Sequence, residues 1–555
     1  MIAITAWRQW FAAPHVARHL ALAVALAVCG AATAQEPARP LPSFAELEAA
    51  GARIGEIRIV TRDIFDTDDP KENKLLFRWA NALHIKTRLG VIERALLFKS
   101  GDPISVRVLD ETERVLRGNR YLYDVQFRPV SVHDGVVDIE VATRDTWTLD
   151  PGVSAGRSGG ANSSGIHLKE YNLLGTGMSV SFGRSKNVDR SSNEFQFSND
   201  RAFGTWTSLS YSLAQNSDGR RDAASIVRPF YAQDARWAAG ITASKDDRID
   251  SIYNAGIVAG QYRHRQDRAE LFGGWSDGLV DGWVRRYSVG MSLQDDAFAL
   301  EPGLVAPAQL PTDEKLVGPF VRFELIEDRY EKQQNRNLIG RPEFFALGFA
   351  STVQLGWAAT GLGSSQDTLL YSGSVSRGFE PAPEHRLIAS AAISGQYAGG
   401  QVRRQRLGAQ ARYYLPQDKR WLFYASASGD MLTHPEPSDE LLLGGDNGLR
   451  GYPLRYQSGQ RRALFTMEER FYTDLYIFRL FRIGGAAFFD TGRAWGGSNV
   501  NKANPGWLSN AGFGLRIVSA RAAFSNVLHV DVAFPLNTTA DIKKVQFLVK
   551  TKASF

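Results

Sequence analysis

The feature that most constrains this fold is a change of periodicity at Pro151. From there to the end of the chain, apolar and polar residues alternate in short runs that turn clusters separate. In residues 206–213, for example, serines alternate with Leu209, Tyr211 and Leu213. A period of two is typical of strands with one apolar and one polar face. The sequence therefore predicts that residues 150–555 are almost entirely β.

A transmembrane barrel accounts for this segment better than a soluble sandwich or propeller, which remains the alternative. After residue 35 no run approaches the roughly 20 apolar residues that a spanning helix needs. Eight of the 12 tryptophans lie beyond Pro151, as expected for aromatic girdles. At about 25 residues per strand and connection, the segment predicts an antiparallel barrel of about 16 strands. The expected fold class is mainly β, with one small α+β domain before the barrel.

The first 34 residues have the layout of a secretory signal peptide. Arg8 and Arg18 precede or flank an apolar stretch, and small residues end at Ala34. The only cysteine, Cys29, lies inside this segment, so we expect the exported chain to carry no disulfide. Lipid attachment at Cys29 is the alternative interpretation.

Residues 35–50 and 51–149 are predicted to be a linker and a small domain. Ser43 and Glu46 form a capping-box pattern, which indicates a short helix within the linker. The domain is expected to run strand, helix, helix, strand, strand, with an additional helix after the first strand. We interpret the periodic apolar residues as core, including those of the additional helix, Leu76, Trp79, Ala80 and Leu83.

Little in the chain suggests catalysis. Gly152-Val-Ser154-Ala-Gly156 matches the spelling of a nucleophile elbow, but a glycine- and serine-rich segment follows in place of the required helix. We interpret it as a turn into the first barrel strand and expect no enzyme. The nine histidines are scattered and no phosphate loop occurs, so we expect no cofactor or metal. No basic tract accompanies the net charge of +6, so nucleic acid is not an expected partner.

The most informative stretch is Leu443–Pro453, which lies in a long connection between two predicted strands. Four of its eleven residues are glycine, which favours a tight and ordered path over a loose tether. Alternation directs Glu468 and Asp490 of the next two strands toward the lumen, because a carboxylate facing lipid would be costly. Arg450 could therefore contact both acids. Spacing alone leaves open that the three residues are unrelated.

These residues resemble the motifs of the BamA/TamA family, also called the bacterial surface antigen family. Leu449-Arg450-Gly451-Tyr452 resembles its [V/L]-R-G-[F/Y] loop signature, and Phe488-x-Asp490-x-Gly492 resembles the strand motif that follows. The C-terminal Phe555 looks like the family's assembly signal, 51–149 is similar to one polypeptide-transport-associated (POTRA) domain, and 171–177 resembles the entry into the first strands.

The resemblance implies a barrel of sixteen strands whose sixth extracellular loop folds back into the lumen. There Arg450 would be anchored to Asp490, with Glu468 as the second carboxylate, and the POTRA-like domain would lie in the periplasm. The implied function is an outer-membrane translocase or insertase that acts without cofactor or catalysis. Its implied partners are outer-membrane lipid, unfolded polypeptide clients and, in addition, periplasmic or inner-membrane proteins.

Within this interpretation, an extended client would add to the domain's strand edge near 136–141, and the closure between the first and last barrel strands would open as a gate. The alternative function is a passive pore or structural barrel that its own lumen loop plugs. An outer-membrane enzyme is a third and weaker hypothesis.

Overall fold

A computed structural model describes residues 41–497, 505–523, 526–538 and 542–552. The predictions for the signal peptide at 1–34, for Cys29 and for the terminal Phe555 lie outside the described residues.

The N-terminal unit has the element order that its periodicity predicts. The helix α2 starts at Ser43 with the predicted capping box, since Glu46 N donates to Ser43 Oγ and Ser43 N donates to Glu46 Oε2. The unit contains α2 (Phe44–Ala49), β1 (Arg53–Arg62), α3 (Leu75–Leu83), α4 (Leu89–Glu93), α5 (Val106–Gly118), β2 (Leu122–His133) and β3 (Val136–Asp145).

The three strands of this unit form one sheet in the order β1-β3-β2, with β1 and β3 parallel and β2 antiparallel to β3. Its helices α2, α4 and α5 contribute to one core, in which Leu116 and Ile139 are fully buried. The predicted client edge near 136–141 is wrong, because those residues form the central strand. The edges are β1 and β2, and Pro129 of β2, which has no N–H to donate, is typical of an edge strand.

The additional helix α3 forms where it was predicted, and its Ala80 packs against a small core cluster, but the other three predicted core residues do not. Leu76, Trp79 and Leu83 are 63%, 60% and 73% exposed. Only Phe77 of this helix is buried, where it packs with Ile64 and Phe65. Apolar periodicity identified the helix, but the expected burial of its wide apolar face was wrong.

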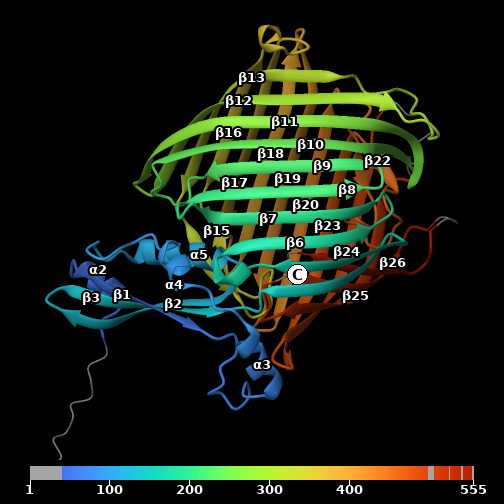
Figure 1. Cartoon of the computed structure of the whole chain (residues 1–555). Coiled ribbons are helices and arrows are strands. Elements are labelled where there is room, and N and C mark those ends of the chain that lie inside the picture. Colours follow the sequence, from blue (N-terminus) through green and yellow to red (C-terminus); the bar gives the residue numbers. More distant parts are fainter. Residues whose placement is uncertain (1–40, 498–504, 524–525, 539–541, 553–555) are drawn as a thin grey trace, which may run out of the picture.

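The rest of the chain closes into one antiparallel barrel, on whose lower left the N-terminal unit lies in Figure 1. The barrel has 20 strands: β4 (Leu149–Ser158), β5 (Ala161–Glu170), β6 (Met178–Lys186), β7 (Ser191–Ala202), β8 (Thr207–Asn216), β9 (Gly219–Arg228), β10 (Trp237–Asn254), β11 (Ile257–Val280), β12 (Trp283–Leu300), β13 (Glu314–Glu327), β16 (Ala350–Ala358), β17 (Thr368–Phe379), β18 (Arg386–Ala398), β19 (Gln401–Pro416), β20 (Trp421–Thr433), β23 (Arg461–Ile477), β24 (Phe481–Trp495), β25 (Leu508–Ser519), β26 (Val527–Pro535) and β27 (Gln546–Lys552).

The prediction of about 16 strands is therefore wrong. Several connections are turns of only two residues, such as Gly159–Gly160, Ala255–Gly256 and Gly399–Gly400. These tight turns leave room for more strands than an allowance of about 25 residues per strand and connection predicts. None of the helices in the described part of the chain is long and apolar enough to cross a bilayer.

Two small hairpins lie outside the barrel wall. The strands β14 (Tyr330–Gln334) and β15 (Pro342–Ala346) pair within the connection from β13 to β16. The strands β21 (Leu441–Leu443) and β22 (Gln457–Gly459) pair within the connection from β20 to β23. The 3-10 turns are η2 (Leu173–Gly175) and η3 (Thr360–Leu362).

The barrel closes through one weak seam between its first and last strands. The pairing of β27 with β4 is recorded at a single position, Val549 with Arg157, among the described residues. On either side of the seam the ladders are continuous, since β26 pairs with β27 from Ala533 to Val527 and β4 pairs with β5 along its whole length.

The N-terminal unit docks on one end of the barrel, called here the N-domain end. Arg88 N donates to Gly175 O (2.9 Å), and Arg107 pairs with Asp234 (2.5 Å). Gly175 has a φ of +73°, and a Cβ there would lie 2.3 Å from Lys86 O. This close approach requires glycine. The opposite end is called the far end.

Candidate functional site

The connection at 434–460, called here the lumen loop, folds back into the barrel from the far end. Its path is ordered by short-range hydrogen bonds, since Asn447 Nδ2 donates to Leu442 O (2.8 Å) and Gly444 N donates to Asn447 Oδ1 (2.6 Å). Leu449 and Tyr452 are fully buried against the wall. The glycine-rich stretch thus forms a packed insert, as its composition indicates.

Arg450 lies at the tip of this insert between two carboxylates. Its Nε and Nη2 donate to Asp490 Oδ2 and Oδ1 at 2.8 and 2.7 Å, and its Nη1 donates to Glu468 Oε1 at 2.8 Å. All three side chains are buried. A guanidinium with two parallel bonds to one carboxylate is a strong and directional contact. The structure therefore brings Arg450 of the loop together with the two acids that alternation placed toward the lumen.

The surroundings hold Asp490 in place for this contact. Thr466 Oγ1 donates to Asp490 Oδ1 (2.9 Å) and Asn510 Nδ2 donates to its Oδ2 (2.8 Å). The Phe488 ring lies under the guanidinium, with its centroid 3.5 Å from Arg450 Cζ. Phe488 and Asp490 of the Phe488-x-Asp490-x-Gly492 motif thus both contact Arg450.

The glycines of both motifs are explained by close packing. A Cβ on Gly451 would lie 2.7 Å from Asn510 Cβ, and one on Gly492 would lie 2.9 Å from Ala463 O and 3.2 Å from Leu443 Cδ2. Next in the loop, Tyr452 OH donates to Ser509 O (2.8 Å). The four-residue loop motif is therefore in contact with the wall along its whole length.

More buried charges surround this clasp than the sequence interpretation named. Arg470 Nε donates to Glu468 Oε2 (2.9 Å), and the fully buried Arg516 pairs with Asp531. Buried ions are stable only when they are paired and hydrogen-bonded. The sequence contains a signal for these additional residues. Alternation within β25 and β26 places Asn510, Arg516 and Asp531 on inward faces.

The lumen loop also contacts both strands of the seam. Ser158 Oγ of β4 donates to Gly445 O (2.6 Å), and Lys550 Nζ of β27 donates to Asp446 O (2.9 Å). Leu454 N donates to Gly159 O in the turn that follows β4 (3.3 Å). Consecutive residues of one insert therefore bridge the two strands whose own pairing is the weakest in the barrel.

A second insert, the hairpin at 328–349, enters the lumen from the N-domain end. Its tip is held by the Glu343 carboxylate, which accepts from the backbone N–H groups of residues 336–338 at 3.0–3.1 Å. Ile339 is buried against Tyr414 and Tyr472 of the barrel wall. Arg470 Nη1 donates to Arg336 O (2.8 Å), so this hairpin reaches the charges beside Glu468. The sequence interpretation missed it.

The same hairpin contacts the N-terminal unit. Lys332 Nζ donates to Glu113 Oε1 of α5 (2.7 Å), and Arg114 Cζ lies 4.2 Å from the centroid of the Tyr330 ring. Nearby, burial raises the pKa of the Glu111 carboxyl above its ordinary value, although Gln233 N donates to it at 2.7 Å. A continuous set of contacts thus runs from α5 through the hairpin to Arg470.

Three other features of the sequence interpretation are also located by the structure. Gly152–Gly156 lies within β4 and runs into β5, so it is neither an elbow nor the predicted turn before the first strand. Within the described residues no cluster of three or more His, Cys, Asp or Glu side chains is placed to hold a metal ion. The 171–177 segment forms the turn from β5 to β6, against which α4 docks.

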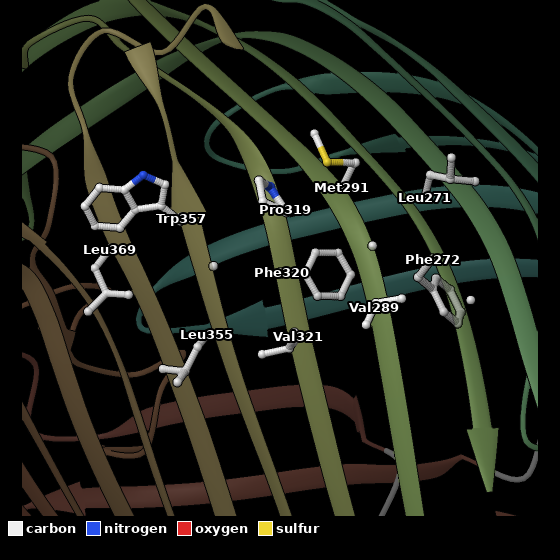
Figure 2. Close-up of a pocket in the computed structure, with 13 residues that line it drawn as sticks. Leu271, Phe272, Val289, Met291, Pro319, Phe320, Val321, Leu355, Trp357 and Leu369 are labelled. Atoms are coloured by element: carbon white, nitrogen blue, oxygen red, sulfur yellow. The ribbon is translucent and has the colours of Figure 1, made fainter. Parts of the chain in front are cut away.

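A hollow of about 680 Å³ lies on the wall across β11, β12, β13, β16 and β17 (Figure 2). It opens beside Pro319, where the pairing of β13 with β16 stops at Phe320 and Gly356. Its lining has no ionisable side chain, and Leu271, Val321 and Trp357 are about half exposed. This lining is typical of a lipid-facing wall.

Residues 375–551 of the chain match the Omp85 superfamily domain, which confirms the family-level resemblance of the loop and strand motifs. Among curated proteins there is no match. Similar solved structures include BamA from Haemophilus ducreyi lacking POTRA domains 1–3, at 12% identity and a TM-score of 0.40, with 90% of this chain and 84% of that chain covered.

CdiB from Acinetobacter baumannii is 13% identical with a TM-score of 0.44, and 90% of this chain and 74% of that chain are covered. CdiB from Escherichia coli is 14% identical with a TM-score of 0.47, and 91% of this chain and 77% of that chain are covered.

Proposed function

We propose that this chain, whose residues 375–551 match the Omp85 superfamily domain, handles polypeptide clients in the bacterial outer membrane, by inserting outer-membrane proteins or by secreting proteins. The observation that carries this proposal is the seam, where a single residue pair between Val549 and Arg157 is recorded and the lumen loop supplies the bridging contacts. A barrel with one weakly paired position can open there without unravelling elsewhere.

Opening the seam exposes two strand edges that an extended client can pair with. A typical hydrogen bond contributes only about 0.5–1.5 kcal/mol net, so a short seam costs far less to open than a full ladder. Exposed edges of β4 and β27 are templates for strand addition. The client's own hydrogen bonding and burial would then drive the step, without nucleotide, cofactor or covalent catalysis.

The Arg450 clasp has a bracing role in this mechanism. It holds the loop tip to β23 and β24 while Gly445 and Asp446 contact both seam strands. Release of the loop would therefore remove two contacts across the seam together. Arg450, Asp490 and Glu468 are assigned this positioning role, and none of them is assigned a catalytic one.

The N-terminal unit, predicted from its resemblance to be a POTRA domain in the periplasm, would receive the client. Its edge strand β2 is available for strand addition, whereas β3 is paired on both sides and the start of β1 already pairs with residues 101–104. The hairpin at 328–349 would link that event to the lumen, because it contacts both α5 and Arg470.

A plugged passive pore is the second candidate, and the two lumen inserts favour it. Photo-crosslinking in intact cells separates the two functions, with the crosslinker at Val130 on the exposed edge β2 and, as a control, at Glu48 on α2. Polypeptide handling predicts that unfolded outer-membrane or secreted proteins are recovered at Val130 and not at Glu48. Equal recovery at both positions would contradict the proposal and favour the pore.

A further inference from the structure

The helix α3 presents an apolar face to the outside of the molecule that the proposed function does not use. Leu76, Trp79 and Leu83, at i, i+3 and i+7, share this face and are largely exposed, together with Leu75. Large contiguous apolar surfaces on a folded protein mark a binding interface. The question is therefore what covers it.

The position of α3 is fixed against the rim of the barrel. Phe77 stacks on Phe65, with ring centroids 4.2 Å apart, and these rings pack with Trp147 and Leu480. Leu480 belongs to the turn between β23 and β24, and Trp147 lies just before β4. Figure 1 shows α3 apart from the other helices and close to the C-terminal strands of the barrel.

A second contact holds the segment before α3 to the next turn of the rim. Arg521, between β25 and β26, pairs with Glu72, and its Nη1 donates to Ile64 O at 3.3 Å. Trp147 N donates to Arg521 O at 2.8 Å. The helix is thus anchored at the N-domain end of the barrel by its inner side, which leaves the Leu76 face directed outward.

The barrel rim on which α3 is anchored also exposes apolar side chains. Phe478, in the turn that carries Leu480, is 73% exposed, and Leu475, near the end of β23, is 57% exposed. The apolar outer wall of a barrel is the surface that lipid covers. A helix anchored to the same rim, with tryptophan and leucine outward, is therefore placed at the level of the membrane interface.

Basic side chains flank this apolar face. Lys71 and Lys74, which precede the helix, and Arg78 within it are exposed, and Arg78 Nη1 donates to Asn73 Oδ1 at 2.7 Å. Of the carboxylates nearby, Asp66 Oδ1 accepts from Asp68 N, Asp69 Oδ1 accepts from Lys71 N and Glu72 pairs with Arg521, while the Asp68 side chain is exposed. Exposed cations beside an apolar helical face are typical of helices that lie on anionic lipid.

We propose that α3 is an interfacial helix whose Leu76, Trp79 and Leu83 enter the membrane leaflet at the N-domain end, with Lys74 and Arg78 on anionic lipid headgroups. The occupant of this face is the bilayer that surrounds the barrel. A consequence is that the N-terminal unit is held to the membrane beside β4, one of the two seam strands.

Lipid quenching of a fluorophore tests the proposal on the full chain. A polarity-sensitive probe is attached to Leu83→Cys in a Cys29→Ser background, and the protein is placed in nanodiscs of phosphatidylethanolamine and phosphatidylglycerol that contain a shallow spin-labelled lipid. Val136→Cys, exposed at the outer end of the N-terminal unit, is the matched control. The proposal predicts strong quenching at 83 and none at 136, and equal quenching at both positions overturns it.

Further variants separate the sources of a negative result. Val321→Cys on the outer barrel wall reports whether the barrel itself lies in the bilayer. A barrel that has not entered the bilayer is thereby distinguished from a helix α3 that does not contact lipid. Lys74→Gln with Arg78→Gln should reduce quenching at 83 in the anionic discs, and an unchanged signal removes the headgroup contact. A probe at 83 that is shielded in cells but unquenched in nanodiscs indicates a protein partner and overturns the lipid assignment.

Discussion

Arg450 and Asp490, which lie 40 positions apart in the chain, are joined by two hydrogen bonds of 2.8 and 2.7 Å in the barrel interior. Glu468 binds the third nitrogen of the same guanidinium. The pair fastens the tip of the lumen loop to the wall, and the same loop bridges the seam. The predictions below test this arrangement one contact at a time.

The first prediction concerns the clasp. Arg450→Ala leaves two buried carboxylates without their shared cation, which is expected to cost about 3–5 kcal/mol and to release the loop. Limited proteolysis within 434–460 should become fast, while the barrel keeps its heat-dependent shift on gels. Arg450→Lys should give an intermediate rate, because an ammonium cannot make the two parallel bonds to Asp490. A loop that stays resistant in Arg450→Ala would remove the clasp from the account.

The second prediction uses two adjacent glycines as their own control. A Cβ at Gly159 would lie 2.3 Å from Leu454 N, whereas at Gly160 nothing lies within 4 Å, and both residues have positive φ. Both alanine variants carry a similar backbone penalty of roughly 1 kcal/mol. Only Gly159→Ala should displace the lumen loop, as measured by proteolysis of 434–460. Equal rates in the two variants would show that the turn does not position the loop.

The third prediction concerns the hairpin at the N-domain end. Glu343→Ala removes the acceptor for three backbone N–H groups, and each lost bond is worth about 1 kcal/mol. The hairpin tip should loosen and the conductance of single barrels in planar bilayers should rise. Glu380→Ala is the control, because Glu380 pairs with Arg329 at an exposed position, where a salt bridge contributes little. Unchanged conductance in Glu343→Ala would exclude a sealing role.

Much of the clasp could be predicted because two local signals agree. Alternation assigns Glu468 and Asp490 to inward faces whatever the strand count, and the glycine content of Leu443–Pro453 indicates a packed loop. The strand count depends on connection lengths, and an average spacing overlooks two-residue turns such as Gly159–Gly160, although Gly-Gly is itself a hairpin signal. The average spacing therefore gave the wrong number of strands, whereas the alternation gave the correct direction of the Glu468 and Asp490 side chains.

Other features depend on contacts that a single segment does not encode. The hairpin at 328–349 owes its burial to Tyr414 and Tyr472, which belong to distant strands. In α3 the periodicity of Leu76, Trp79 and Leu83 predicts a helix with an apolar face, but nothing in the sequence says whether protein or lipid covers that face. The central position of β3 follows from sheet order, which alternation alone does not reveal.

The seam provides the most direct test of the central claim that it opens for a client. Arg157 and Val549 are paired across it, and the Cα separation of paired residues, about 4.5–5.5 Å, permits a disulfide. Arg157→Cys with Val549→Cys locks the seam, and Arg157→Cys with Asn162→Cys links two strands that are already paired, as a control. Both are made in a Cys29→Ser background.

The measurement is insertion or export of the client captured at Val130, in liposomes that contain each variant, before and after reduction. The account predicts that the oxidised seam variant is inactive and recovers on reduction, while the control pair is active in both states. Full activity of the oxidised seam variant would contradict the account.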